Sequence, residues 1–170
     1  MREYKPGAEA VAAVKEMMKS VGPQTSFFVD LQGSCKRSNC FILGCAPPRE
    51  VGKPLSEKVF AYLMWCARSD FFSFSDCRYD PPVGKLLGSG RAFARKEYGV
   101  LNSFNFFATS GGLNFGSLSG MHLNPGTLLK FGEYLGEIIY EYAKSSSVKK
   151  EGVINQVYAM YKQWYPDYVI

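Results

Sequence analysis

The chain has 170 residues, and its 20 Lys and Arg against 15 Asp and Glu give a formal net charge of +5. Hydrophobic residues make up 46% of the sequence and aromatic residues 15%, a composition that excludes a disordered chain. The sequence contains no apolar run near the roughly 20 residues that a membrane-spanning helix needs. We therefore expect a single domain over residues 1–170, large enough to bury a core without disulfides or a structural metal.

The first residues and the cysteine count both bear on the compartment. The segment MREYKPGAEAVAAV is charged and interrupted by Pro6, unlike a secretory signal peptide. Five cysteines is an odd number, so at least one thiol has no partner within the chain. These features predict an intracellular, cytoplasmic protein with unpaired thiols.

The N-terminal third is predicted to contain one helix and two strands. Residues 8–21 form the helix, which ends at Gly22-Pro23. Its apolar stripe consists of Val11, Val14, Met18 and Val21. Residues 26–31 and 40–45 read as short strands, and the polar, basic segment QGSCKRSN between them is typical of an exposed hairpin loop.

The middle of the chain alternates between helices and strands. A second helix is predicted over residues 55–67, and the aromatic run at 71–74 reads as a strand. Residues 91–98 read as a short helix between Ser89-Gly90 and Gly99, and residues 104–107 read as a further strand. Residues 109–126 contain five glycines and no periodicity, which predicts a long loop.

The C-terminal part is predicted to be helical. Asn124 is a candidate N-cap, and Pro125 suits the first position of a helix over residues 125–144. The serines at 145–147 separate it from a last helix that ends at Tyr165. The resulting order predicts an α+β fold: a small, mainly antiparallel sheet of about four strands packed with four to five helices, two of them C-terminal.

The 125–144 helix has a second apolar stripe, and a helix that is apolar on two sides is expected to be central rather than peripheral. The stripe has small residues in its middle and consists of Leu129, Gly132, Gly136, Ile139 and Ala143. Small residues on a helix let another backbone approach closely. The stripe therefore predicts contact with another helix, either within the chain or in a protein partner or second copy.

The cysteines do not form a metal-binding pattern. Cys35, Cys40 and Cys45 are spaced at five, whereas structural zinc sites use two tight Cys or His pairs. We expect no metal and no other cofactor, and we interpret most thiols as core residues. Cys35 is the exception, because it should be exposed and the adjacent Lys36 and Arg37 favour its thiolate.

His122 is the only histidine in the chain, so any mechanism that needs an imidazole has to use it. Together with Cys35 as nucleophile, and with Asp30 or Asn124 to orient the ring, it would make a Cys-dependent hydrolase or transferase. The surrounding GSLSG is not a nucleophile elbow, because its central residue is Leu118.

A glycine-rich segment, GKLLGSGRAFARK, precedes and enters the 91–98 helix. Free N–H groups at a helix N-terminus can hold an anion, although neither a Walker A loop nor a GxGxxG motif is present. Together with the basic residues after the first strand, it predicts a surface for phosphate or nucleic acid. The candidate residues are Lys36, Arg37, Lys85, Gly88, Gly90, Arg91, Arg95 and Lys96.

These observations favour a non-catalytic binding or assembly protein. It would contact RNA or DNA phosphates, or a protein partner, through its basic and glycine-rich loops. The alternative is the Cys-dependent hydrolase or transferase. In either case we predict that the 109–126 loop is the main functional surface, because a loop so rich in glycine stays ordered only through specific hydrogen bonds or a bound partner.

Overall fold

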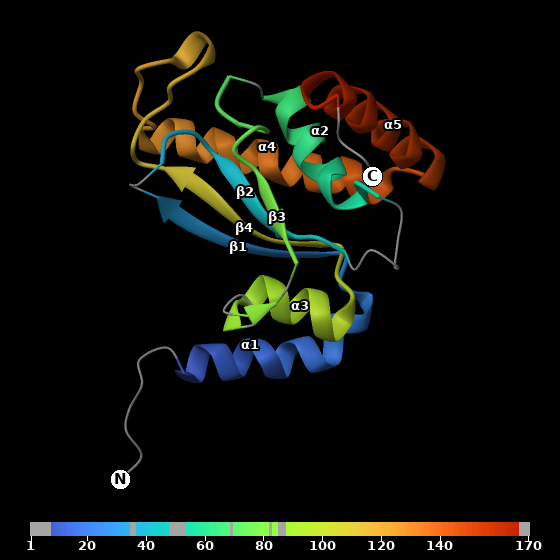
Figure 1. Cartoon of the computed structure of the whole chain (residues 1–170). Coiled ribbons are helices and arrows are strands. Elements are labelled where there is room, and N and C mark those ends of the chain that lie inside the picture. The colour runs from blue at the N-terminus through green and yellow to red at the C-terminus, as the bar shows by residue number, and fades with distance from the viewer. Residues whose placement is uncertain are drawn as a thin grey trace.

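The computed structural model describes residues 8–34, 37–47, 54–68, 70–81, 83–84 and 88–166. Figure 1 shows a central sheet with α2, α4 and α5 on one face and α3, followed by α1, on the other. The α+β class, the order of helices and strands and the pair of C-terminal helices are confirmed. The elements are α1 (Ala8–Val21), β1 (Phe27–Ser34), β2 (Phe41–Cys45), α2 (Val59–Ala67), β3 (Arg78–Asp80), α3 (Gly90–Tyr98), β4 (Asn102–Thr109), α4 (Pro125–Lys144) and α5 (Ser147–Trp164).

Capping residues set the helix boundaries. Ser89 accepts a hydrogen bond from the backbone N–H of Ala92 at the start of α3, and Gly99 ends that helix with a φ of 68°. The Asn124 side chain caps α4 in the same way, with Pro125 in the first turn. These signals are local in sequence, so the predicted limits of α3 and α4 agree with the structure.

The sheet is mixed, and the prediction of a mainly antiparallel sheet is wrong. The strand order is β1-β4-β2-β3, with β1 parallel to β4 and β2 parallel to β3. β2 and β4 form the antiparallel pair. The predicted hairpin between β1 and β2 does not form, because β4 lies between them. Its inward rings, Phe104 and Phe106, are 2% and 1% exposed, so burial draws this strand into the middle of the sheet.

The predicted strand at residues 71–74 is also wrong. Within this segment only Phe72 forms an isolated bridge, to Cys40, and the third strand of the sheet is β3. Phe71, Phe72 and Phe74 are nevertheless buried. The run of aromatic residues therefore indicates burial correctly. It does not indicate the backbone conformation, because turns can also direct aromatic rings into a core.

The main core lies between the sheet and the α2/α4/α5 face. Phe60 of α2 stacks on Phe104 of β4 with ring centres 5.2 Å apart, and Phe27 of β1 meets the edges of Phe60 and Tyr142 at 5.1 Å. A smaller cluster of Met18, Ala94 and Val100 joins α1 to α3 on the other face. The sheet is thus covered on both sides, and its core is built mainly from aromatic rings.

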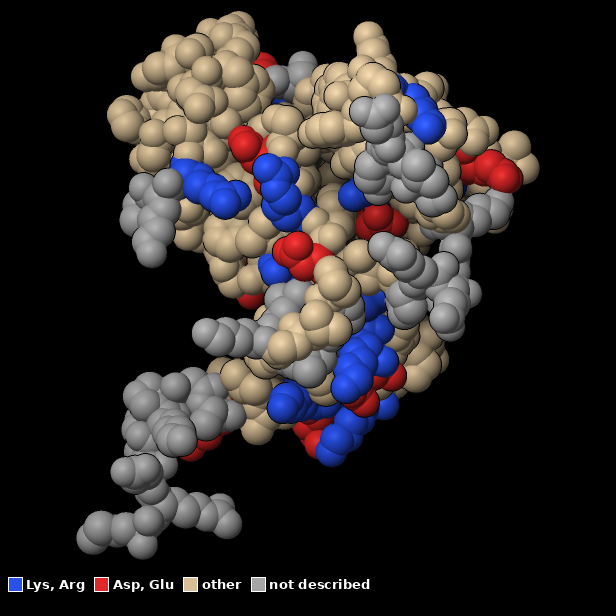
Figure 2. Space-filling view, in the orientation of Figure 1, with Lys and Arg blue, Asp and Glu red and all other residues tan. Residues whose placement is uncertain are grey.

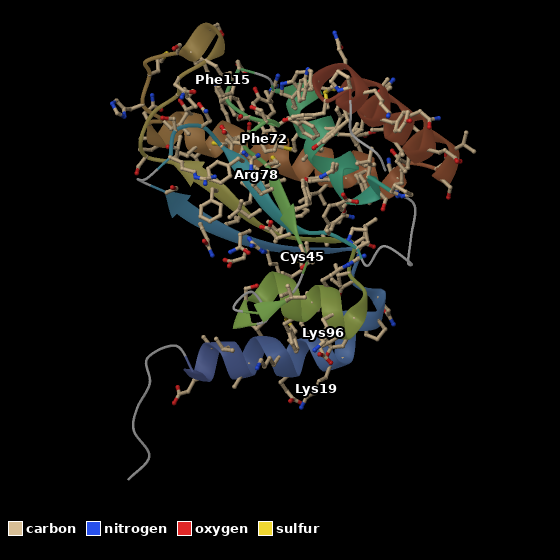
Figure 3. The ribbon with its side chains drawn as sticks, viewed as in Figure 1. Lys19, Cys45, Phe72, Arg78, Lys96 and Phe115 are labelled. Carbon is tan, nitrogen blue, oxygen red and sulfur yellow. The ribbon has the colours of Figure 1, made fainter. Side chains whose placement is uncertain are left out.

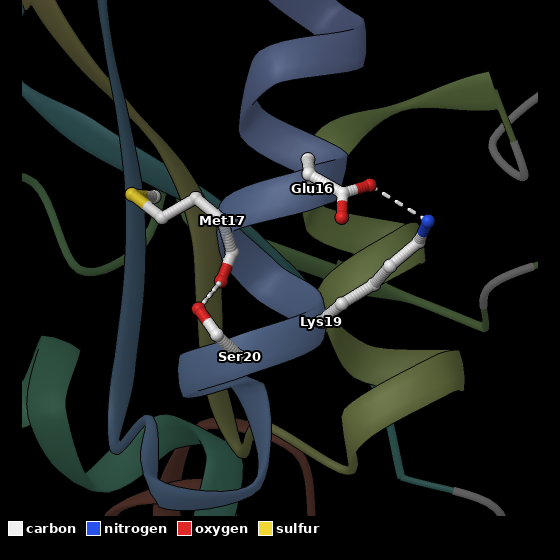
Figure 4. Close-up of polar contacts among 4 residues, drawn as sticks. All are labelled: Glu16, Met17, Lys19 and Ser20. Atoms are coloured by element: carbon white, nitrogen blue, oxygen red, sulfur yellow. Dashed lines mark hydrogen bonds and ion pairs between the residues drawn. The ribbon is translucent and has the colours of Figure 1, made fainter.

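The outer helix α1 contributes little to burial. Met18 of the predicted apolar stripe is 2% exposed, whereas Val11 is 56% exposed. Figure 4 shows its polar side, where Lys19 Nζ lies 2.7 Å from Glu16 Oε2. An exposed pair of this spacing contributes little to stability, because water and salt screen the two charges. Among all the described residues, no helix has both the length and the apolar character needed to cross a bilayer.

Two buried thiols make the free energy of unfolding depend on pH in the alkaline range. Burial raises the pKa of Cys77 from 9.0 to about 12 and that of Cys40 from 9.0 to about 11. Both thiols are therefore neutral in the folded protein over a range in which they ionise in the unfolded chain. Their contribution is complete below pH 9.0 and is lost as the pH rises through the folded-state values.

We expect Cys77→Ala to flatten this alkaline loss. The free energy of unfolding, measured by urea titration between about pH 7 and about pH 11, should fall less steeply in the variant than in the parent protein. Cys66→Ala is the matched control, because Cys66 is exposed on α2. Equal slopes for Cys77→Ala and the parent would contradict the assignment.

Candidate functional site

The candidate site lies at the carboxyl ends of the parallel strands β1 and β4. Their last residues, Ser34 and Thr109, are paired in the register of the sheet. Ligands of α/β sheets bind in the crevice outside the carboxyl ends of parallel strands. Because β2 runs antiparallel to β4, the residues that precede β2 lie at this same edge. We call it the carboxyl edge.

The 109–126 loop is ordered by backbone hydrogen bonds at this edge. Ser110 N–H donates to the Ser34 carbonyl at 2.8 Å, and Asn39 N–H donates to the Gly112 carbonyl at 3.0 Å. Leu113 N–H donates to the Met121 carbonyl at 2.9 Å, which closes the loop on itself. The loop contains no Lys, Arg, Asp or Glu, and its region at the upper left of Figure 2 is uncharged in that view.

Asn39 joins the loop to the segment before β2. It is 3% exposed and has a φ of 68°, a conformation that Asn tolerates better than most residues. Its side-chain amide donates to Asn114 Oδ1 at 2.8 Å and to Asp76 Oδ2 at 3.2 Å. Its own Oδ1 accepts from Asn114 N–H at 3.1 Å. One buried side chain therefore holds three segments of the carboxyl edge together.

These segments enclose a pocket of about 430 Å³, within the range of small-ligand sites. Figure 3 places two of its residues, Phe72 and Phe115, on the α2/α4 side of the sheet, away from Cys45 and from Lys96 on α3. Its lining is partly aromatic and partly polar. The lining residues are Trp65, Phe72, Phe74, Phe115 and Trp164, together with Asn39, Ser73, Ser75, Asp76 and Asn114.

Another cavity, of about 310 Å³, lies between α2, α4 and α5. Its walls include Val59, Leu63, Ile138 and Val153, with Lys149 and Lys150 among its other lining residues. It is formed by helices and lies away from the strand ends. The pocket at the carboxyl edge is therefore the better candidate, because it combines strand ends, an ordered loop and convergent polar groups.

Several residues predicted for the site are placed at this edge or lie outside the described residues. Cys35, Lys36 and Lys85 lie outside them. Arg37 is exposed, and its backbone carbonyl accepts a hydrogen bond from Thr109 Oγ1 at 2.7 Å. The guanidinium carbon of Arg37 lies 5.4 Å from the ring centre of Phe41, which stacks on Phe107, so its charge lies over these two rings on one face of the sheet.

His122 is also at the carboxyl edge, but Asp30 has different partners. His122 Nδ1 lies 3.4 Å from the Ser110 carbonyl oxygen on an exposed part of the loop. Asp30 Oδ2 accepts hydrogen bonds from Gln32 at 2.7 Å and Asn105 at 3.3 Å. Asn124 is used as the cap of α4. The contacts of Asp30 thus lie within β1 and between β1 and β4, and those of Asn124 lie at the start of α4.

The basic residues of α3 serve mainly the fold. Arg91 is 7% exposed and donates from Nη1 to the Leu43 carbonyl at 3.1 Å. Arg95 donates to the Gly99 carbonyl at 3.3 Å, and burial lowers its pKa. Lys96 is exposed, and so is Gly88 ahead of the helix. At Gly90 a side chain is excluded by packing, because a Cβ there would lie 2.9 Å from the Phe28 ring. Both arginines of the predicted phosphate-binding segment, Arg91 and Arg95, therefore make contacts within the protein.

The pocket residues were missed by sequence reasoning. Asp76 lies 37 positions after Asn39 in the chain, and Asn114 lies 75 positions after it, so no local motif connects them. The two tryptophans of the chain, Trp65 and Trp164, both line the pocket. The residue type was the one available signal, because tryptophan is enriched at recognition surfaces, but that the two lie together is seen only in the structure.

Comparison with known proteins gives three informative relatives, while no protein-family model matches the chain. Cytosolic carboxypeptidase 2 of Danio rerio is 25% identical over 136 residues, which cover 80% of this chain and 19% of the relative. The protein of the same name from Mus musculus is 24% identical over 136 residues, covering 80% and 15%. The one from Homo sapiens is 25% identical over 122 residues, covering 72% and 13%. The chain spans less than a fifth of the length of these relatives.

The relatives correct the functional prediction. Carboxypeptidases are hydrolytic enzymes, so the similarity contradicts a non-catalytic binding or assembly protein, and that prediction is wrong. No residue pattern indicated a carboxypeptidase, because the chain carries one histidine and none of the common hydrolase motifs. Self-association through the 125–144 helix stays a prediction. The Cβ positions at Gly132 and Gly136 have no neighbouring atom within 4 Å, so the middle of the stripe is open, whereas Ile139 packs against the main core.

Proposed function

We propose that this chain contributes the peptide-binding part of a carboxypeptidase-type hydrolase, with the carboxyl edge as the place where the peptide end binds. The observation that carries the proposal is similarity to cytosolic carboxypeptidase 2 across 80% of the chain. The name of that relative means an enzyme that removes residues from the carboxyl end of a peptide. The ligand class to test is therefore a peptide with a free terminal carboxylate.

The geometry of the carboxyl edge supports this proposal. It combines an exposed cation, Arg37, with the pocket lined by Asn39. The Arg37 guanidinium lies over Phe41, whose ring stacks on Phe107, whereas the pocket residue Phe72 packs on Phe106, which points to the other face of the sheet. A guanidinium binds a carboxylate with two parallel hydrogen bonds. Arg37 would hold the terminal carboxylate of the peptide.

The residues of this chain do not fit the zinc site of a carboxypeptidase by themselves. Catalytic zinc in carboxypeptidase A is held by two His and one Glu, and this chain has one His. Among the described residues, no three His, Cys, Asp or Glu side chains are grouped as metal ligands. We therefore derive no catalytic step through a metal ion from these residues.

A specific contact favours Cys-dependent hydrolysis as the second candidate. Ser110 binds the Ser34 carbonyl through its N–H and lies 3.4 Å from His122 Nδ1 through its own carbonyl oxygen. Cys35 follows Ser34 in the sequence, although it lies outside the described residues. In this candidate an imidazole near a thiol would remove its proton and generate the nucleophile.

The test uses N-acetylated peptides that differ only in a free or an amidated carboxyl end. We expect tighter binding of the free-carboxylate peptide and release of its last residue, followed by mass spectrometry. Loss of the release with a metal chelator would indicate a metal-dependent reaction, and its loss in Cys35→Ser would indicate the thiol. Equal binding of both peptides together with no release would overturn the proposal.

Arg37→Gln tests the carboxylate contact directly. We expect it to weaken binding of the free-carboxylate peptide by about 10- to 100-fold, because a hydrogen bond to a charged group contributes about 1.5–3 kcal/mol. Binding of the amidated peptide should change little. Lys96→Gln on α3 is the charge-matched control and should bind both peptides like the parent protein, whereas equal losses in the two variants would indicate a general charge effect.

The predicted intracellular location agrees with the proposal. The relatives are cytosolic by name, and the four cysteines in the described part of the chain are free thiols. Free thiols are typical of a reducing compartment.

A further inference from the structure

The pocket at the carboxyl edge has an aromatic wall built from three mutually neighbouring rings. The ring centres of Trp65 and Trp164 lie 6.5 Å apart, and both lie 6.3 Å from the ring of Phe74. The wall joins three elements: Trp65 is on α2, Trp164 ends α5, and Phe74 lies in the turn between α2 and β3. Trp164 is 42% exposed although it neighbours this cluster, so its ring is partly open to solvent.

The lining of the same pocket also includes a carboxylate. Asp76 is half-buried, and its Oδ2 accepts one hydrogen bond from the neutral Asn39 amide at 3.2 Å. The ion pairs among the described residues are Lys19 with Glu16 and Lys58 with Glu57, so none of them uses Asp76. Arg78 is close in sequence, but its Nη1 donates to the carbonyls of Ser75 and Cys77. Within the described part of the chain, the Asp76 charge therefore has no cationic side chain paired with it.

We propose that this pocket binds the cationic side chain of a peptide, an arginine or a lysine. Aromatic faces attract ammonium and guanidinium groups through the negative charge density of their π-systems, and this attraction strengthens as water is excluded. A carboxylate facing the same space supplies the opposite charge and accepts the N–H groups of the ligand. A pocket of about 430 Å³ has room for such a side chain.

The chemistry of the walls disfavours the other ligand classes. An acidic side chain would meet Asp76 and the electron-rich faces of the rings, both of which repel it. A purely aliphatic side chain would leave the carboxylate and the Asn39 and Asn114 amides facing apolar surface. The inference rests on the proposed function only in that a peptide is the carrier of the cation.

The experiment compares two peptides that differ in charge and hardly in shape. They are acetyl-Gly-Arg-Gly-amide and the same peptide with citrulline in place of arginine. Both lack a free carboxylate, so the result is independent of the Arg37 contact. The two tryptophans of the chain both line the pocket, so their fluorescence reports occupancy. We expect the arginine peptide to bind about tenfold more tightly than the citrulline peptide.

Two variants and one control assign the binding to the walls. Asp76→Asn keeps the shape of the side chain and should remove most of the preference for arginine over citrulline. Asp80→Asn removes an exposed carboxylate on β3 outside the pocket and should leave the preference unchanged. Trp164→Tyr keeps an aromatic face of smaller area and should lower the affinity for the arginine peptide, with thermal unfolding used to verify that each variant is folded.

Each outcome has a defined meaning. Equal affinity for arginine and citrulline peptides, or an unchanged preference in Asp76→Asn, overturns the proposal. Binding of tetramethylammonium without binding of the arginine peptide overturns the peptide as the source of the cation. A clear arginine preference in a protein that shows neither carboxylate-dependent binding nor hydrolysis supports the cation pocket and contradicts the proposed function, so the two failures are distinguishable.

Discussion

Phe60→Ala is expected to remove about 3–5 kcal/mol from the free energy of unfolding, the cost typical of deleting a large buried ring. Phe60 is 0% exposed and is central to the aromatic core. Its ring stacks on Phe104 at 5.2 Å and meets Phe27 at 5.1 Å and Tyr142 at 6.0 Å. The substitution therefore opens a cavity between α2, α4 and the sheet. Since the free energy of unfolding of a domain is roughly 5–15 kcal/mol, the substitution is expected to remove a large part of it.

The measurement is urea unfolding of the parent protein and of two variants. Phe93→Ala is the matched control, because Phe93 is a partly buried ring in the smaller cluster on the other face of the sheet. It should cost clearly less than Phe60→Ala. A loss below about 1 kcal/mol for Phe60→Ala would show that the rings on this face are not the core of the domain.

Asn39→Ala is expected to cost about 2–4 kcal/mol and to disorder the pocket at the same time. The φ of 68° at this position is unfavourable for Ala, and the substitution removes the side-chain bonds to Asp76 and Asn114. It also leaves the Asn114 N–H without its acceptor. Because these bonds join three segments, we expect faster proteolysis within residues 109–126 as well as a lower urea midpoint.

Asn39→Gly separates the two causes. Glycine adopts positive φ without strain, so this variant loses the hydrogen bonds but not the backbone conformation. It should recover about 1–2 kcal/mol of the loss in Asn39→Ala while the loop stays sensitive to protease. If both variants match the parent protein in protease resistance, the loop is held by its backbone contacts alone.

The helices were predictable because their signals are local. The Ser89 cap and the Gly99 stop of α3, and the Asn124-Pro125 start of α4, each lie within a few residues of the boundary they set. The strands of the sheet were found as segments, but their order was not. β1 pairs with a strand about 75 residues later in the chain, and nothing within either segment specifies that partner over β2.

The pocket was not predictable for a related reason. Its polar groups and its tryptophans come from five separate segments, and none of them stands out in its own sequence surroundings. The residues that did attract attention, Arg91 and Arg95, have basic side chains whose charge is visible in sequence but whose burial is not. A sequence displays which groups carry charge, whereas only the fold determines which of them face solvent.

The position of β1 has a consequence for the behaviour of the protein in concentrated solution. β1 is the outermost strand of the described sheet next to β4, and its eight residues, FFVDLQGS, contain no proline and no lysine. Leu31 is 67% exposed on it. Natural edge strands are usually blunted by lysine, proline or a bulge, because open backbone groups can template pairing with another chain. The exposed edge of β1 can therefore pair with a strand of another chain. A lysine in place of Leu31 is the substitution that would oppose this pairing if the protein is to be stored or crystallised at high concentration.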